Sequence, residues 1–243
     1  MFSAVSVVKP LTMSWWRGGG RRTAAALATA LVAFTLFFYR DLLFERRVTV
    51  FRDQYTILLA LDWVVRLLSQ WNWPPLWTPF QVLGKPLAAD PLAAVYYPLN
   101  WVLRLLPFPL GYNASLAVHH ALAVVGVYAL LRRRDIGREA AAFGGLLFGF
   151  GGLFVAFDNM SNAVQSATWL PWTLLAFDAW CDRPRAIWLV ATAGGLALTL
   201  LGGMPEVFLF EQVLFVALVL EHRRRGGPSL AQAAVAGVTA TTK

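Results

Sequence analysis

Apolar segments about as long as a bilayer is thick dominate this chain and restrict what it can fold into. An α-helix crosses the hydrocarbon core of a membrane with about 20 predominantly apolar residues. Segments of this kind lie near residues 23–38, 111–131, 140–157, 165–181, 186–203 and 205–221. The pattern predicts an all-α fold, a polytopic bundle of transmembrane helices, with a further helix beginning after Pro228.

The composition agrees with a membrane protein and argues against several other classes. Hydrophobic residues make up 58% of the chain and charged residues only 14%, so a soluble domain would lack the polar side chains to cover its surface. The net charge of +8 would suggest nucleic acid as a partner of a soluble protein. Here the basic residues stand in short clusters between apolar segments, which favours membrane lipids as partners and no nucleic acid. The single cysteine, Cys181, excludes an intramolecular disulfide and a cysteine-based zinc site.

The connections between the apolar segments alternate in charge, and this alternation predicts the orientation. Arginines cluster at 132–134, 183–185 and 223–225, whereas the opposite connections, 158–163 and 202–205, contain no Lys or Arg. Basic loops stay on the cytoplasmic side. We therefore expect a multi-pass protein of the bacterial inner (plasma) membrane with a cytoplasmic N-terminus and a long extracytoplasmic first loop.

These boundaries predict three regions. Residues 1–23 form a cytoplasmic tail, and residues 24–222 form a six-span bundle that includes the extracytoplasmic loop 40–110. Residues 223–243 form a cytoplasmic basic loop and the start of a further helix, which ends before it could cross a bilayer. Either this last segment lies at the interface, or the chain is the N-terminal part of a longer protein.

Two interfacial helices are expected within the long loop. Residues 58–68 are apolar except for Asp62 and Arg66, which are four apart and can pair on one helical face. A second short helix is expected from Pro91 to about Arg104, with Asp90 as its N-cap. In the first helix, the side chains expected to face lipid are Leu58, Leu59, Trp63, Val65 and Leu67 or their neighbours.

Several short motifs follow one another in a familiar order. They are Arg-Asp-Gln-Tyr at 52–55, Pro-Leu-Trp-Thr-Pro-Phe at 75–80, Gly-Lys-Pro-Leu-Ala-Ala-Asp-Pro at 84–91, Tyr-Pro-Leu-Asn at 97–100, and a histidine in the second apolar segment. In this order the chain resembles, over about residues 24–222, the N-terminal half of YfhO-like bacterial membrane proteins. Those proteins look like members of the GT-C superfamily of glycosyltransferases, which use polyprenyl-phosphate-linked sugars.

The resemblance implies catalytic carboxylates in the first outer loop. It places Asp53 near the acceptor, where an inverting transfer needs a base to take a proton from the attacking hydroxyl. The lipid-phosphate leaving group needs positive charge, which Lys85, Arg52 or Arg66 could supply. Asp90 is the second candidate, as a carboxylate or as a ligand, with Asp53, of a divalent metal such as Mg or Mn. Both aspartates could instead only cap helices.

Other polar and aromatic side chains are candidates for binding the sugar or the acceptor. The histidines of the second segment could equally form a helix–helix hydrogen bond, and Glu206 could only complement a helix dipole. Trp71, Trp73, Trp77, Tyr96 and Tyr97 suit stacking on sugars, but they also suit an aromatic belt at the membrane surface. The candidate substrate-binding residues are Gln54, Lys85, Tyr97, Asn100, His119, Asn159, Asn162 and Glu206.

Three functional hypotheses follow. The first is a membrane glycosyltransferase, or the N-terminal half of one, that moves a sugar from a polyprenyl-phosphate donor to an extracytoplasmic acceptor. The second is a transporter or translocase of a lipid-linked saccharide, which would require charged groups or broken helices inside the membrane. The third is a non-catalytic or truncated membrane protein.

Overall fold

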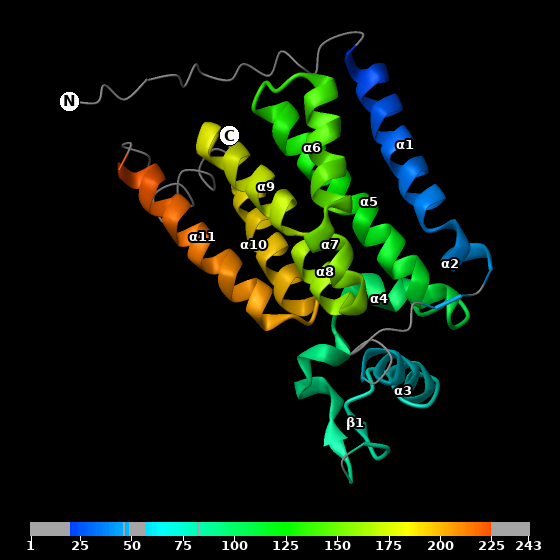
Figure 1. The fold of residues 1–243 in the computed structure, drawn as a ribbon. Coiled ribbons are helices and arrows are strands. Elements are labelled where there is room, and N and C mark those ends of the chain that lie inside the picture. Colours follow the sequence, from blue (N-terminus) through cyan, green and yellow to red (C-terminus); the bar gives the residue numbers. More distant parts are fainter. Residues whose placement is uncertain (1–19, 46, 49–56, 82, 225–243) are drawn as a thin grey trace.

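The computed structural model describes residues 20–45, 47–48, 57–81 and 83–224, and these are mostly helical (Figure 1). The elements in chain order are α1 (Gly20–Phe38), α2 (Arg40–Phe44), α3 (Leu59–Ser69), β1 (Trp77–Thr78), β2 (Lys85–Pro86), η3 (Leu87–Ala89), η4 (Pro91–Ala93), α4 (Pro98–Leu103), α5 (Leu110–Arg133), α6 (Arg138–Phe150), α7 (Gly152–Ala156), η5 (Phe157–Asn159), α8 (Ser161–Ala167), α9 (Leu170–Asp182), α10 (Ala186–Leu201) and α11 (Pro205–Arg224). Helices α1, α5, α10 and α11 follow the predicted apolar segments, but the segment predicted near 165–181 is divided between α8 and α9, which are separated by Thr168 and Trp169.

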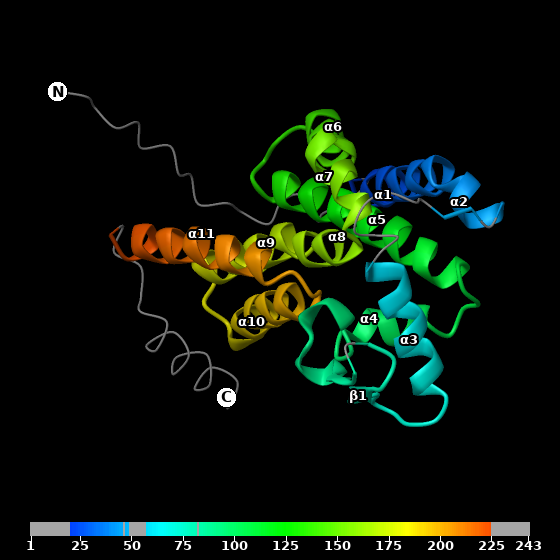
Figure 2. The ribbon, with the colours of Figure 1, turned by 60° about the horizontal axis from the view of Figure 1, so that its bottom comes forward.

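Helix α5 lies at the centre of the long helices and packs against α1, α6, α8 and α9 (Figures 1 and 2). Its close contact with α6 depends on small residues. A methyl group at Gly145 would lie 2.6 Å from the Val124 carbonyl oxygen, and Ala141 on the same helix is fully buried. Small residues at this contact therefore let the backbones of the two helices approach closely.

Among the described residues, two helical segments are long and apolar enough to cross a membrane. They are Leu110–Arg133, which is α5, and Arg138–Asn159, which comprises α6, α7 and η5. Helix α10 is apolar but shorter.

The second of these segments is interrupted. The helix leaves helical geometry at Gly151, whose backbone is extended with ψ at 153°, and resumes as α7. The sequence predicted one continuous helix over residues 140–157, and the difference has a physical cause. A pair of glycines, Gly151 and Gly152, lies at this point, and glycine is the least costly residue at which to leave a helix.

A small subdomain covers one end of the long helices, at the bottom of Figure 1. It comprises residues 57–81 and 83–104 and is called the cap below. Strands β1 and β2 pair antiparallel, with Trp77 opposite Pro86. The core of the cap is built by Leu61, Val64, Val65, Leu87, Ala93 and Val95.

The cap corrects two expectations. Helix α3 forms where the first interfacial helix was predicted, but Leu58 and Val65 are buried in the protein rather than turned toward lipid. The predicted helix from Pro91 to Arg104 is two separate elements, η4 and α4. Ala94 adopts a left-handed conformation with φ at 42°, which ends η4, and Pro98 then begins α4.

Candidate functional site

Two arginines and one aspartate form a charged cluster where the cap meets the long helices. The Asp62 carboxylate accepts hydrogen bonds from Arg66 Nε at 2.6 Å and from Arg104 Nε at 2.9 Å. The three side chains are only 10–12% exposed. The predicted pairing of Asp62 with Arg66 is confirmed, and Arg104 joins it from a distant part of the chain.

The cluster carries one more positive than negative charge. Arg66 Nη1 donates to the carbonyl oxygens of Arg104 and Leu106, and Arg104 Nη2 donates to the Ala93 carbonyl. Arg104 Nη1 is buried and has no hydrogen-bond partner in the described part of the chain. Burial lowers the pKa of Arg104, although Asp62 opposes this effect, and a guanidinium stays protonated in proteins. The environment thus favours an added negative charge or an oxygen acceptor beside Arg104.

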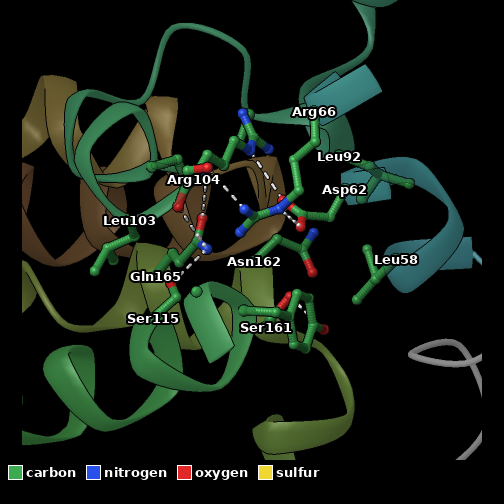
Figure 3. Close-up of a pocket in the computed structure, with 14 residues that line it drawn as sticks. Leu58, Asp62, Arg66, Leu92, Leu103, Arg104, Ser115, Ser161, Asn162 and Gln165 are labelled. Atoms are coloured by element: carbon green, nitrogen blue, oxygen red, sulfur yellow. Dashed lines mark hydrogen bonds and ion pairs between the residues drawn. The ribbon is translucent and has the colours of Figure 1, made fainter. Parts of the chain in front are cut away.

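A small polar cavity lies against this cluster. Figure 3 shows Asp62, Arg66 and Arg104 on its cap side, with Ser115, Ser161 and Gln165 on the side of the long helices. Its accessible volume is about 30 Å³. A single water needs roughly 10–15 Å³ on this measure, so the cavity accommodates one or two waters or a single hydroxyl or phosphate oxygen.

Most amides and hydroxyls around the cavity are engaged with one another. Gln165 Nε2 donates to Asn100 Oδ1 at 3.2 Å and to Ser115 Oγ at 3.1 Å, which ties α8 to α4 and α5. Asn162 Nδ2 donates to the Gly203 carbonyl at 2.9 Å. Its Oδ1 atom is buried and lacks a partner among the described residues. Two of the residues that line the cavity, Arg104 and Asn162, thus each carry a buried polar atom without a hydrogen-bond partner in the described part of the chain.

A larger, open pocket borders the same two arginines. It encloses about 640 Å³, within the range of small-molecule sites. Trp63 packs edge-to-face on Phe108, and Trp73 packs edge-to-face on Trp101, each with ring centroids 5.7 Å apart. The residues that line it are Trp63, Arg66, Ser69, Gln70, Trp73, Trp101, Arg104, Leu105, Leu106, Pro107 and Phe108.

Asp90 and Lys85 lie together in the cap, away from the cavity and the pocket. Lys85 Nζ contacts Asp90 Oδ2 at 2.6 Å, and the Leu92 amide donates to Asp90 Oδ1 at 3.0 Å. Asp90 is thus the N-cap that the sequence predicted, and both of its oxygens are engaged. Neither residue lines the cavity or the pocket.

Tyr97 and His119 are also brought together, in a buried hydrogen-bonded chain. Trp169 Nε1 donates to the Tyr97 hydroxyl at 2.7 Å, and that hydroxyl contacts His119 Nε2 at 2.6 Å. Burial raises the pKa of the Tyr97 phenol. These hydrogen bonds connect the cap to α5 and to the start of α9, but Tyr97 and His119 do not line the cavity.

The remaining candidates are dispersed or fall outside the described residues. Asn159 is half-buried in η5, and Glu206 is exposed in the first turn of α11. Neither lines the cavity. Asp53 and Gln54 lie outside the described residues. Arg52 does so too.

Within the described ranges, no group of three or more His, Cys, Asp and Glu side chains could hold a metal ion. Several cavity residues were not singled out from the sequence. Ser115, Ser161 and Tyr112 give no local signal, because a hydroxyl in an apolar helix is ordinary. A better clue was available for Arg104, a charged residue between apolar stretches, which is costly to bury without a partner.

Comparisons with protein-family models, with curated proteins and with solved structures give no match for this chain.

Proposed function

We propose that the chain is a polytopic protein of the bacterial plasma membrane, with the cap outside the cytoplasm. Two observations support this arrangement. The structure has two helices apolar and long enough to span a bilayer. The Arg-rich turn between α5 and α6 and the C-terminal end of α11 lie at the end of the long helices opposite to the cap (Figure 1). Basic residues collected at one end are what the positive-inside rule requires.

We further propose that the cap binds a polyprenyl-phosphate-linked sugar and that the protein transfers this sugar to an extracytoplasmic acceptor. The observation that carries the proposal is the net-positive Arg66–Asp62–Arg104 cluster, with a spare guanidinium donor, between a polar cavity and an aromatic pocket. Arginine suits phosphate recognition, and aromatic faces suit sugar rings and isoprenoid chains.

Each part of such a donor has a matching surface. The phosphate would accept hydrogen bonds from Arg104, and a sugar hydroxyl would donate to Asn162 Oδ1. In the transfer, Asp53 would take the proton from the acceptor hydroxyl as its oxygen attacks the anomeric carbon. The bond from that carbon to the phosphate oxygen breaks, and the arginines stabilise the negative charge on the departing phosphate.

A binding measurement tests the donor site. The protein in lipid nanodiscs is titrated with a short-chain polyprenyl phosphate and with the matching uncharged polyprenol, with tryptophan fluorescence as the readout. We expect the phosphate to bind more tightly, and we expect Arg104→Gln to abolish this preference. Lys85→Gln is the matched control, because it removes a cap cation outside the cavity and the pocket. Equal affinity for the two lipids, or a loss in Lys85→Gln alone, contradicts the proposed site.

An activity measurement tests the chemical step. Asp53→Asn in the complete protein should abolish sugar transfer while the amount of protein in the membrane stays unchanged. Retained transfer removes Asp53 from the mechanism.

A translocase of lipid-linked saccharides is the second candidate. The observation that favours it is the break between α6 and α7 at Gly151, inside a segment long enough to cross a bilayer. Transporters build their sites at such discontinuous helices. Flipping of a fluorescent lipid-linked sugar in proteoliposomes without sugar transfer would favour this candidate over the first.

A further inference from the structure

Helix α5 carries two adjacent buried histidines, and the first of them needs no extra proton. His119 Nδ1 lies 2.6 Å from the Ser115 carbonyl oxygen, and its Nε2 lies 2.6 Å from the Tyr97 hydroxyl. A carbonyl only accepts, so Nδ1 carries the hydrogen and donates it. The Tyr97 hydroxyl can donate to Nε2. A neutral imidazole therefore satisfies every contact of His119.

His120 has different partners. Its Nδ1 lies 2.7 Å from the Gly149 carbonyl oxygen, and its Nε2 lies 2.8 Å from Asp158 Oδ1. The carbonyl and an ionised carboxylate both only accept, whereas a neutral imidazole has a single N–H. With His120 neutral and Asp158 ionised, lone pairs would face each other at one of these two contacts, across 2.7 or 2.8 Å. One additional proton, on the imidazole or on the carboxylate, satisfies both contacts.

We propose that His120 and Asp158 form a proton-binding site that holds one exchangeable proton inside the helical bundle. Tyr39 completes the site, because its hydroxyl contacts Asp158 Oδ2 at 2.7 Å and can donate to it. The three side chains come from the α1–α2 junction, from the middle of α5 and from η5. The site is separate from the cavity beneath the cap and does not depend on sugar transfer.

Aromatic rings and titratable groups surround His120. The ring centroids of Tyr39 and Phe154 lie 5.1 and 4.9 Å from that of His120, both in edge-to-face arrangements. The titratable groups that face His120 are Asp158 from η5, Tyr39 from the α1–α2 junction and His119 on the same helix.

The exposure of the pair indicates where the proton enters. The His120 side chain is fully buried, whereas 16% of the Asp158 side chain is exposed. A proton therefore reaches Asp158 first and passes to His120 Nε2 along the hydrogen bond between them.

Occupancy of this site is coupled to the broken helix. Gly149 lies just before the break at Gly151, and its carbonyl accepts from His120 Nδ1. The same imidazole contacts Asp158, which follows α7. Loss of the proton leaves one N–H for two acceptors, so one of the two contacts of His120, to Gly149 before the break or to Asp158 after it, becomes repulsive. The proton thus controls the position of the segment after the break, as expected for a proton-coupled movement of a membrane protein.

Nitrogen NMR of the protein with ¹⁵N-labelled histidine tests the proposal directly, because the chain has only three histidines. The His222→Gln variant assigns the third signal. We expect His120 at neutral pH to carry hydrogen on both nitrogens and His119 to carry one. Infrared spectroscopy provides a second measurement, because a proton that resides on Asp158 instead gives a carboxylic-acid C=O band that Asp158→Asn removes. Either signal supports the shared proton.

Asp158→Asn is the matched variant, since the amide keeps the contacts and removes the proton site. Its Nδ2 can donate to a neutral His120 Nε2, and its Oδ1 can accept from Tyr39. We expect His120 in this variant to become a neutral imidazole that no longer changes over a pH series, with the His119 signal unmoved. The proposal is overturned if wild-type His120 is neutral and no acid band is present, a result that holds whether or not the variant folds.

Discussion

Arg104 Nε donates to Asp62 Oδ1 across 2.9 Å and thereby ties the end of α4 to the cap helix α3. The second oxygen of the same carboxylate is taken by Arg66. A single aspartate thus neutralises part of the charge on two buried guanidiniums, and both arginines line the cavity. The stability of the cap and the proposed affinity for an anion therefore depend on the same three side chains.

Replacement of Asp62 should destabilise the cap strongly. In Asp62→Asn two buried guanidiniums lose their counter-charge, and removal of one partner of a buried pair costs about 3–5 kcal/mol. We expect a clear fall in the midpoint of thermal unfolding in detergent. Glu45→Gln is the control, because its pair with Arg47 is largely exposed and such pairs contribute about 0–1 kcal/mol. Equal midpoints for the two variants would show that the cluster does not stabilise the cap.

A methyl group at Gly111 should displace Arg66. The added carbon would collide with the Leu103 carbonyl oxygen and lie 2.6 Å from Arg66 Nη2. We expect Gly111→Ala to lower the unfolding midpoint and to weaken the binding of polyprenyl phosphate. Gly194→Ala is the matched control, because nothing lies within 4 Å of its new carbon and alanine favours a helix by about 0.5–1 kcal/mol. A Gly111→Ala protein with wild-type stability and affinity would contradict this account of Arg66.

Structural features that depend on residues close together in the sequence were predicted correctly. The long helices follow from runs of apolar residues, and the Asp62–Arg66 pair follows from helical spacing. The role of Asp90 as a helix N-cap follows from the proline after it. Each of these features is fixed within about one turn of the chain. The sequence shows a pair of glycines at the break between α6 and α7, but it did not predict that the helix is interrupted there.

The contacts between helices could not be predicted in the same way. Arg104 reaches Asp62 across 42 residues, and His120 reaches Asp158 across 38. Such pairs depend on the rotation of each helix about its axis, which a polar stripe normally reveals. Helix α5 is apolar on nearly all sides and is buried by several neighbours, so its sequence has no such stripe. His119 and His120 are therefore both buried although they point in different directions, and the sequence did not indicate the partners of either.

The amide pair beside the cavity should show strong coupling between its members. Asn100 and Gln165 exchange hydrogen bonds of 3.3 and 3.2 Å. Gln165→Leu leaves a buried amide without its partner, which costs about 1–3 kcal/mol. The second change, Asn100→Leu, should cost much less in the Gln165→Leu background than in the wild type. A double-mutant cycle of unfolding midpoints measures the difference, and purely additive effects would show that the two amides do not interact.

Arg133 should contribute to stability, whereas the exposed Arg138 at the start of α6 should not. Its guanidinium contacts Asp178 at 3.0 Å and Asp182 at 2.6 Å, and its side chain is buried. Arg133→Gln leaves Asp178 paired with the exposed Arg134. We expect a lower unfolding midpoint for Arg133→Gln and no change for Arg138→Gln. A similar small effect of both changes would mean that Arg133 acts only through the general positive charge of this end.

The proposed orientation predicts opposite labelling of the two ends of the bundle. Replacing the single native cysteine by Cys181→Ala allows new cysteines to be introduced one at a time. Leu83→Cys lies fully exposed in the cap, and Ile136→Cys lies exposed in the turn between α5 and α6. A maleimide that cannot cross membranes should label position 83 in intact spheroplasts and position 136 only after permeabilisation, because the arginines around the turn hold it in the cytoplasm. Both positions should react equally once the membrane is dissolved, which controls for accessibility. Labelling of both positions in intact spheroplasts, or in the reverse order, would rule out an extracytoplasmic cap and with it the proposed transfer to an external acceptor.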